Sequence, residues 1–283
     1  NIPAIKILFG GWFTPGEVLV YRMVFGAAAF WIISLGLPGD RVRKKDFLVF
    51  FLGGAIGLFG MQALYMIGLH DTSPIDASII LTIPPVLVLL FTAVVYKRKL
   101  TVRKIAGILV AMGGALLIIL TQTGGGRGGA TAHGNLYVLI CSVSWAIYLL
   151  LTQQVSQRYR PVTILKWVFL WAAIPSCAVF GPGVWKDGFF IRFPTHEIFS
   201  VLTFILIFPT VVSYLLIPAA MKRLSTTVIS MYSYTVPLIA SVVSVAMGQA
   251  SLRWDQPVAA VMIFIGVYWV NTRRHRTTKI RKG

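Results

Sequence analysis

Three basic residues lie inside long apolar stretches of the chain: Lys6, Arg22 and Lys166. A charge within a membrane costs about 2.5–3.5 kcal/mol on insertion scales, so each is a candidate for contact with a substrate. Lys6 is a candidate lining residue, with snorkelling to the membrane surface as the alternative. Arg22 and Lys166 lie a few residues inside their segments, where snorkelling or a bond to backbone carbonyls is favoured over substrate contact.

No acidic side chain lies deep in an apolar segment. Asp76 comes nearest to doing so, and SPID at 73–76 matches a helix start with Ser73 as the cap, so we expect Asp76 to take part in capping. No pair of histidines or cysteines has the spacing of metal ligands, and we predict no catalytic residue, metal or cofactor. Without a buried acid, proton-coupled export of cationic drugs is disfavoured, unless that acid lies outside the given residues.

Hydroxyl, amide and aromatic side chains within the apolar segments form the predicted lining of a transport path. Such a lining, with cationic charge nearby, suits a neutral, zwitterionic or anionic metabolite. For each aromatic residue, packing or a place in the interfacial belt is the alternative. Besides Lys6, the candidates are Asn1, Gln62, Tyr65, Ser78, Thr82, Trp145, Tyr148, Thr152, Thr210, Ser213, Tyr214, Ser230, Tyr232, Ser233 and Tyr234.

The elements that must position these residues are membrane helices. Of the 283 residues, 57% are hydrophobic and 12% charged, whereas soluble domains carry about 25% charged residues. The opening NIPAIKILFGGWFTP is too short for a full span, so we expect the first helix to be cut at its start. The apolar segments are 1–13, 16–37, 47–69, 74–96, 103–121, 135–155, 161–181, 198–221, 226–248 and 254–272.

The basic residues between these segments predict the orientation. Alternate connections and the C-terminal tail hold 19 Lys and Arg residues, and the remaining connections hold four. This bias places the basic loops and both termini in the cytoplasm, in a bacterial inner membrane. The net charge of +18 is explained by this topology, and we predict no nucleic-acid partner. The expected partners are the lipid bilayer and a small-molecule substrate.

The two halves of the chain show a weak repeat. Shifting the sequence by 152 residues lays the fourth segment over the ninth, with Pro85 on Pro237. Because each half has five segments, the second half enters the membrane from the opposite side, as in transporters with inverted repeats. We predict a first repeat at 1–121, a Gly-rich external loop at 122–133, a second repeat at 134–272 and a basic cytoplasmic tail at 273–283.

Prolines within the segments predict helix breaks. Pro84, Pro85 and Pro237 fall at matched depths in the fourth and ninth segments, and we expect these breaks to face a shared central cavity. The alternative is that membrane helices simply tolerate proline. The third and eighth segments are also weakened, by Gly57 and Pro209 among others. Flexing and close glycine packing remain equal alternatives for them.

The whole chain resembles the drug/metabolite transporter superfamily, in particular its EamA-type exporters. The resemblance rests on GMQALYMIGLHDTSPIDASIILTIPPVLVLLF, LTVRKIAGILVAMGGALLI, SWAIYLLLTQQV and the start NIPAIK. It implies an all-α membrane protein of ten helices in two inverted five-helix repeats. One departure is that the glutamates usual before the fifth and tenth helices are replaced by Lys97/Arg98 and Gln249/Ala250, so no role of those glutamates carries over.

The resulting prediction is a secondary transporter that exports a small metabolite such as an amino acid. It would work by alternating access at a central cavity between the repeats. The alternative from another class is a membrane-embedded enzyme acting on a lipid-linked or phosphate-containing substrate, which would need clustered acids, histidines or a metal set. A receptor or scaffold without transport is the third alternative.

Overall fold

The computed structural model describes residues 1–95, 97, 101–121, 131–187, 195–224, 235–249 and 253–271. All regular elements in these ranges are helices, in agreement with the predicted all-helical class. They are α1 (Ile2–Leu8), α2 (Pro15–Leu35), α3 (Lys44–Leu52), η1 (Gly53–Leu58), α4 (Phe59–His70), α5 (Pro74–Ile80), α6 (Pro84–Val95), α7 (Val102–Leu120), α8 (Ala132–Ser156), α9 (Pro161–Asp187), α10 (His196–Ile205), η2 (Leu206–Val212), α11 (Ser213–Met221), α13 (Thr235–Ala246) and α14 (Asp255–Asn271).

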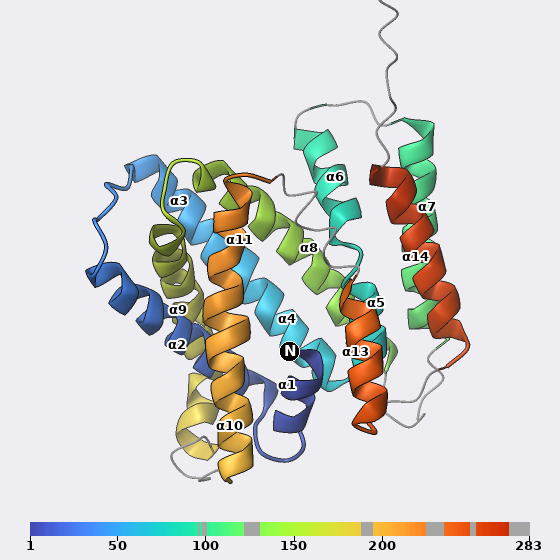
Figure 1. The fold of residues 1–283 in the computed structure, drawn as a ribbon, viewed down its shortest axis with the longest axis horizontal. Coiled ribbons are helices and arrows are strands. Elements are labelled where there is room, and N and C mark those ends of the chain that lie inside the picture. The colour runs from blue at the N-terminus through green and yellow to red at the C-terminus, as the bar shows by residue number, and fades with distance from the viewer. Residues whose placement is uncertain are drawn as a thin grey trace, which may run out of the picture.

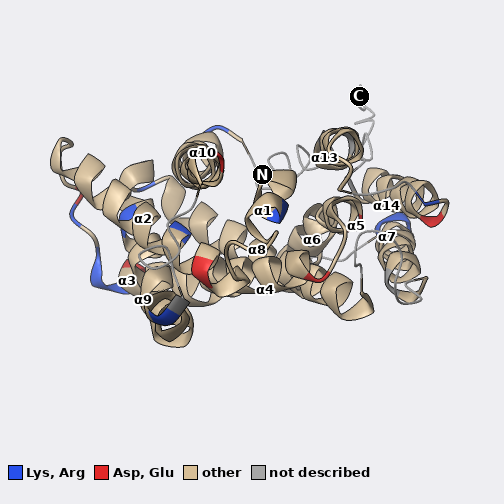
Figure 2. Ribbon diagram, turned by 90° about the horizontal axis from the view of Figure 1, so that it is seen from below, with Lys and Arg blue, Asp and Glu red and all other residues tan. Residues whose placement is uncertain are grey.

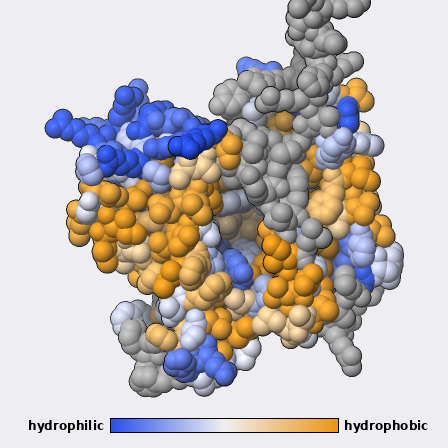
Figure 3. Space-filling view, viewed as in Figure 1, coloured by the Kyte–Doolittle hydropathy of each residue, from blue (hydrophilic) through white to orange (hydrophobic). Residues whose placement is uncertain are grey.

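Six helical stretches of the described chain are long and apolar enough to cross a membrane. α2, α8 and α9 each form one, while α3–η1–α4, α5–α6 and α10–η2–α11 are composite stretches. Large apolar side chains on their outer faces stay exposed, as lipid-facing residues do: Leu35 is 83% exposed and Ile32 is 67% exposed. Figure 3 shows this apolar band between more hydrophilic ends, with a hollow in its middle. The protein is therefore an integral membrane protein.

The helices form two groups with α1 between them (Figure 1). One group contains α2, α3, α9 and the composite helix α10–η2–α11, and the other contains α6, α7, α13 and α14. α8 runs between the groups and contacts both α4 and α6. Seen along the helices, α1 lies between α10 and α13 (Figure 2), and it contacts both. The short first helix therefore lies where the two groups face each other.

Small residues join helices into pairs within each group. On α7 and α14, a Cβ atom added to Gly107 would lie 2.6 Å from the carbonyl oxygen of Gly266, and Ala111 beside them is fully buried. The sequence spacing of Gly107, Ala111 and Ala115 predicts this packing seam. On α2, Gly16 and Gly26 leave room for the rings of Phe180 and Phe169 of α9. Both pairs are therefore held by close helix contact.

The composite helix α5–α6 is interrupted at its prolines. α5 ends at Ile80 and α6 begins at Pro84. Proline at the first position of a helix loses no intrahelical bond, because that N–H would have no partner there. The hydroxyl groups of Ser78 and Thr82 donate to the carbonyl oxygens of Ile75 and Ile79, both at 2.7 Å. The break is buried inside the protein, as non-helical backbone in a membrane must be.

The two other composite helices each contain a π-helical turn, η1 and η2. In η2, Pro209 has no N–H to bond the carbonyl oxygen of Ile205, and the hydroxyl of Thr210 donates to that oxygen instead, at 2.9 Å. In η1, a Cβ atom on Gly54 would lie 2.5 Å from the carbonyl oxygen of Val168 on α9. The weakening that the sequence predicts in both segments is thus present as a wide turn in each.

Two loops at one end of the molecule are bound to each other through acidic side chains. Asp46, at the start of α3, accepts two bonds from Nη1 of Arg158, at 2.9 and 3.0 Å, and one from the Tyr159 hydroxyl at 2.6 Å. Asp40 accepts from the backbone N–H of Arg160 and from the hydroxyl of Thr163, both at 2.8 Å. The basic loop before α3 is visible in blue in Figure 2. These bonds tie the α2–α3 loop to the α8–α9 loop.

Candidate functional site

The centre of the molecule holds a buried guanidinium group. Arg22 lies on α2 and is 1% exposed. Its Nε donates to the Thr210 hydroxyl at 2.9 Å, and its Nη1 donates to Oε1 of Gln62 at 3.0 Å. The interpretation of Arg22 as a residue that snorkels or bonds backbone carbonyls is therefore wrong, because the guanidinium points inward and bonds two side chains.

Gln62 and Tyr214 extend this network. Nε2 of Gln62, on α4, donates to the hydroxyl oxygen of Tyr214, on α11, at 2.8 Å. The two residues are separated by 152 positions, which is the shift that relates the two halves of the sequence. Gln62 is 1% exposed and Tyr214 is 4% exposed. The network therefore connects α2, α4, η2 and α11 within the protein interior.

Beside this network is a cavity of about 250 Å³. One wall is aromatic: the ring of Trp145 stacks on that of Tyr148 at 5.1 Å and 15°, and Tyr214 lies edge-on to Trp145 at 6.3 Å. Among the described residues that line it, the charged side chain is that of Arg22. The lining residues are Asn1, Ile2, Arg22, Met61, Gln62, Tyr65, Leu81, Cys141, Trp145, Pro209, Ser213, Tyr214, Ile217 and Val236.

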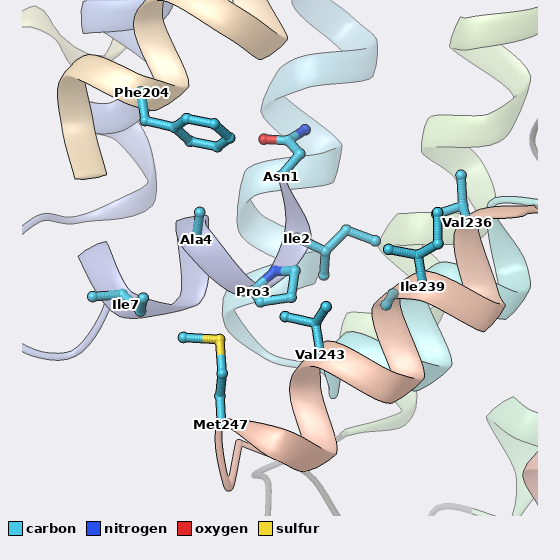
Figure 4. Close-up of a pocket in the computed structure, with 11 residues that line it drawn as sticks. Asn1, Ile2, Pro3, Ala4, Ile7, Phe204, Val236, Ile239, Val243 and Met247 are labelled. Atoms are coloured by element: carbon cyan, nitrogen blue, oxygen red, sulfur yellow. The ribbon is translucent and has the colours of Figure 1, made fainter. Parts of the chain in front are cut away.

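An apolar groove of about 420 Å³ adjoins the cavity. Asn1, Ile2 and Val236 line both spaces. Figure 4 shows Phe204 of α10 on one side of α1, and on the other Val243 of α13 and Met247 just after the end of α13. The groove therefore shares three lining residues with the cavity and lies between α10 and α13.

Several of the residues that the sequence predicts as lining do line the cavity. Asn1, Gln62, Tyr65, Trp145, Ser213 and Tyr214 do so. Thr210 holds Arg22, and Tyr148 supports Trp145 from behind. Of the predicted helix breaks, Pro209 lines the cavity, whereas Pro84, Pro85 and Pro237 are not among its lining residues and Leu81 and Val236 take their place.

Other predicted lining residues lie elsewhere. Nζ of Lys6 donates to the carbonyl oxygen of His70 at 3.0 Å, at the end of α4, and Lys6 does not line the cavity. Ser78 and Thr82 serve the break in α5–α6, and Thr152 is buried in α8. Ser230, Tyr232, Ser233 and Tyr234 lie outside the described residues.

Two other interpretations of single residues are refined by the structure. Ser73 caps α5 by accepting from the N–H of Asp76, as predicted. The carboxylate of Asp76 also accepts from Nε2 of Gln256 at 2.8 Å and lies 3.9 Å from Nη1 of Arg253. Nζ of Lys166 lies 4.9 Å from the centre of the Trp31 ring, in a cation–π contact.

Comparison with known proteins identifies the family. The family model described as EamA-like transporter family matches residues 1–120 and 132–272. The chain belongs to the EamA-like transporter family. The sequence resemblance to EamA-type transporters is therefore confirmed. The family and the named relatives are transporters, which points away from an enzyme.

Relatives of this EamA-like protein carry transporter names. An uncharacterized transporter, YyaM of Bacillus subtilis (strain 168), is 25% identical over 91% of this chain and 84% of its own length. The aromatic amino acid exporter YddG of Ancylobacter novellus is 24% identical over 83% of this chain and 80% of its own length. A protein of known crystal structure matches with a TM-score of 0.63 and 20% identity, covering 94% of this chain and 90% of that one, and shares the fold. The protein is a membrane transporter of a small molecule.

Proposed function

We propose that this transporter exports an amino-acid-like metabolite across the bacterial cytoplasmic membrane by alternating access. The proposal includes ten membrane helices in two inverted five-helix repeats, 1–121 and 134–272, with both termini in the cytoplasm. Membrane transport itself is supported by the family and by the relatives. The direction and substrate class follow the name of one relative, the aromatic amino acid exporter. The cytoplasmic termini follow the distribution of basic loops.

The observation that carries the proposal is the hydrogen bond between Gln62 and Tyr214. Two residues at equivalent positions of a twofold repeat can bond directly only where they face each other across the symmetry axis. A 2.8 Å bond across 152 positions therefore supports an axis that passes beside the cavity. The π-helical turns support the same relation, since shifting η1 by 152 residues superposes it on residues 205–210, which overlap η2.

The arrangement also supports a mechanism. Substrate sites of transporters built from inverted repeats lie near the middle of the membrane, on interrupted helices, and access alternates as one part rocks against the other. Here the cavity is lined by two composite helices, α3–η1–α4 and α10–η2–α11, each with a wide turn. A wide turn has a locally weaker backbone ladder, so it is a place where a helix can bend.

Counterflow in reconstituted vesicles tests the proposal. Vesicles loaded with unlabelled phenylalanine are diluted into a trace of labelled phenylalanine, and saturable uptake of label is expected. Tyr214→Phe removes the bond at the proposed axis and should slow counterflow. Tyr268→Phe, an equivalent change at a 65% exposed position on α14, is the matched control. Turnover of a lipid-linked or phosphate ester by the purified protein, without counterflow of any amino acid, would favour the enzyme alternative.

A further inference from the structure

We infer that Arg22 binds the carboxylate of the transported molecule and that an ammonium group on that molecule is dispensable. This inference rests on the proposed function and deepens it, because it names the chemical group that the cavity recognises. It follows from the charges around Arg22, from the N–H donors that Arg22 has left over and from the residues that line the cavity.

Within the described ranges, the charge of Arg22 has no acidic partner close by. None of the ion pairs formed within 4.0 Å among the described residues includes Arg22. Its two bonding partners, Gln62 and Thr210, are neutral. A buried charge is costly unless it is paired, and a single unpaired cation inside a membrane protein indicates a functional site. An anionic ligand would supply the missing counter-charge.

The geometry leaves donors for such a ligand. A guanidinium group carries five N–H donors in a planar fork, which matches the two oxygens of a carboxylate. Within the described part of the chain, Arg22 uses Nε and one N–H of Nη1. The donors on Nη2 remain, and Arg22 lines the cavity. Gln62 and Thr210 hold the fork in place from two different helices, so they are positioning residues.

The walls of the cavity indicate the rest of the molecule. Trp145, Tyr65 and Tyr214 offer aromatic surface next to the guanidinium. A volume of about 250 Å³ lies below the roughly 300–1,000 Å³ of sites for drug-sized ligands, so the cavity suits a small molecule. Its described lining contains no Asp or Glu that would pair with an ammonium group. A small carboxylate with an apolar or aromatic body fits this chemistry, whether or not it carries an amine.

Equilibrium binding to the purified full chain tests the inference without transport. The probes are phenylalanine, phenylpyruvate, which lacks the amine, and phenethylamine, which lacks the carboxylate. Binding is followed by quenching of tryptophan fluorescence, with Trp145→Phe to assign the signal. We expect phenylalanine and phenylpyruvate to bind and phenethylamine not to bind. Binding of phenethylamine equal to that of phenylalanine, or no binding of either carboxylate, would overturn the inference.

Substitution assigns the contact to its residue. Arg22→Gln should weaken binding of both carboxylates about ten- to hundredfold, the usual range for a hydrogen bond to a charged group. Arg22→Lys keeps the charge but not the fork and should give an intermediate affinity. Lys166→Gln removes another membrane cation, one that does not line the cavity, and is the matched control. Should Arg22→Gln not fold, the Lys variant and the three probes still decide.

The outcomes separate this inference from the proposed function. Wild-type protein that binds the two carboxylates but shows no counterflow would contradict transport of these molecules and leave the role of Arg22 standing. Wild-type protein that exchanges phenylalanine, with Arg22→Gln binding it as tightly as Lys166→Gln does, would contradict the role of Arg22 and leave transport standing.

Discussion

The wide turns η1 and η2 are similar in shape but differ in how they are built and in what surrounds them. In η1 the glycines are buried, and Gly54 and Gly57 allow close contact with α9 and α8. In η2 the buried residue is Thr210, while Phe208 is 55% exposed. The first turn is fixed between two neighbouring helices, whereas the second is made by a proline and carries a side chain that holds Arg22. The comparison teaches that one kind of backbone irregularity can serve helix packing in one place and hold a buried arginine in the other.

The largest expected effect comes from filling the contact at η1. Gly54→Leu places a Cβ atom against the backbone of Val168, which has no flexible end to give way. Overpacking costs typically about 1–3 kcal/mol, and a backbone neighbour puts this change at or above the top of that range. Thermal unfolding in detergent should show the loss. Gly183→Leu on α9 is the control, since nothing lies within 4 Å of that position, and an equal loss there would remove the distinction between tight and open glycines.

The next largest effect is expected at Thr210 of η2, whose hydroxyl accepts from Arg22. Thr210→Val keeps the shape of the side chain but removes the bonds to Arg22 and to the carbonyl oxygen of Ile205. Leaving such buried groups without partners costs about 1–3 kcal/mol. Phenylalanine binding and thermal stability should both fall, and Thr210→Ser should restore most of each. Unchanged binding in Thr210→Val would show that η2 does not position Arg22.

At Pro209 we expect a substitution to change stability less than at Thr210 and to change transport more than stability. Pro209→Ala supplies an N–H that can bond the carbonyl oxygen of Ile205, and one net hydrogen bond contributes about 0.5–1.5 kcal/mol. The unfolding temperature should therefore rise or stay level while counterflow slows, because the wide turn is straightened. Pro84→Ala, at the first turn of α6, is the comparison variant and should change stability little. Faster counterflow in Pro209→Ala would contradict a role of η2 as a bending point.

The smallest expected effect is the pH dependence of stability that Asp40 causes in the loop between α2 and α3. Partial burial alone would raise the pKa of Asp40, but hydrogen bonds from the Arg160 N–H and the Thr163 hydroxyl, with the charges of Arg160 and Lys222, lower this pKa below its usual value. The ionised form therefore stabilises the fold at pH above about 4, and that contribution is lost as the pH falls through the lowered pKa. The unfolding temperature should drop slightly more at low pH in wild-type protein than in Asp40→Asn.

The weak points of the helices could be predicted from the sequence because they depend on local chemistry. Proline lacks an N–H wherever it stands, so Pro84 and Pro209 indicate irregular backbone at 81–83 and at η2 without knowledge of their neighbours. The four-residue spacing of Gly107, Ala111 and Ala115 on α7 likewise predicts a packing seam. Which side such a break faces depends on tertiary packing, and here Leu81 lines the cavity in place of Pro84 and Pro85.

The role of Arg22 could not be predicted, for a physical reason. Its partners Gln62 and Thr210 lie 40 and 188 positions away, and no local pattern reports such a pairing. Its place a few residues inside the segment also resembled that of Lys166, which bonds an aromatic ring. For Ser78 and Thr82 the sequence predicts side chains that line the transport path. In the structure their hydroxyl groups instead donate to carbonyl oxygens of α5.

Under the proposed arrangement of two inverted halves, the Gln62–Tyr214 bond has an energetic consequence. If the halves were chemically identical, exchanging their conformations would yield inward-open and outward-open forms of equal free energy. Because an amide occupies one of the paired positions and a phenol the other, that degeneracy would be lifted at the proposed axis. Under the proposed mechanism one orientation is then preferred at rest, and a cargo that binds the other orientation more tightly shifts the balance toward it.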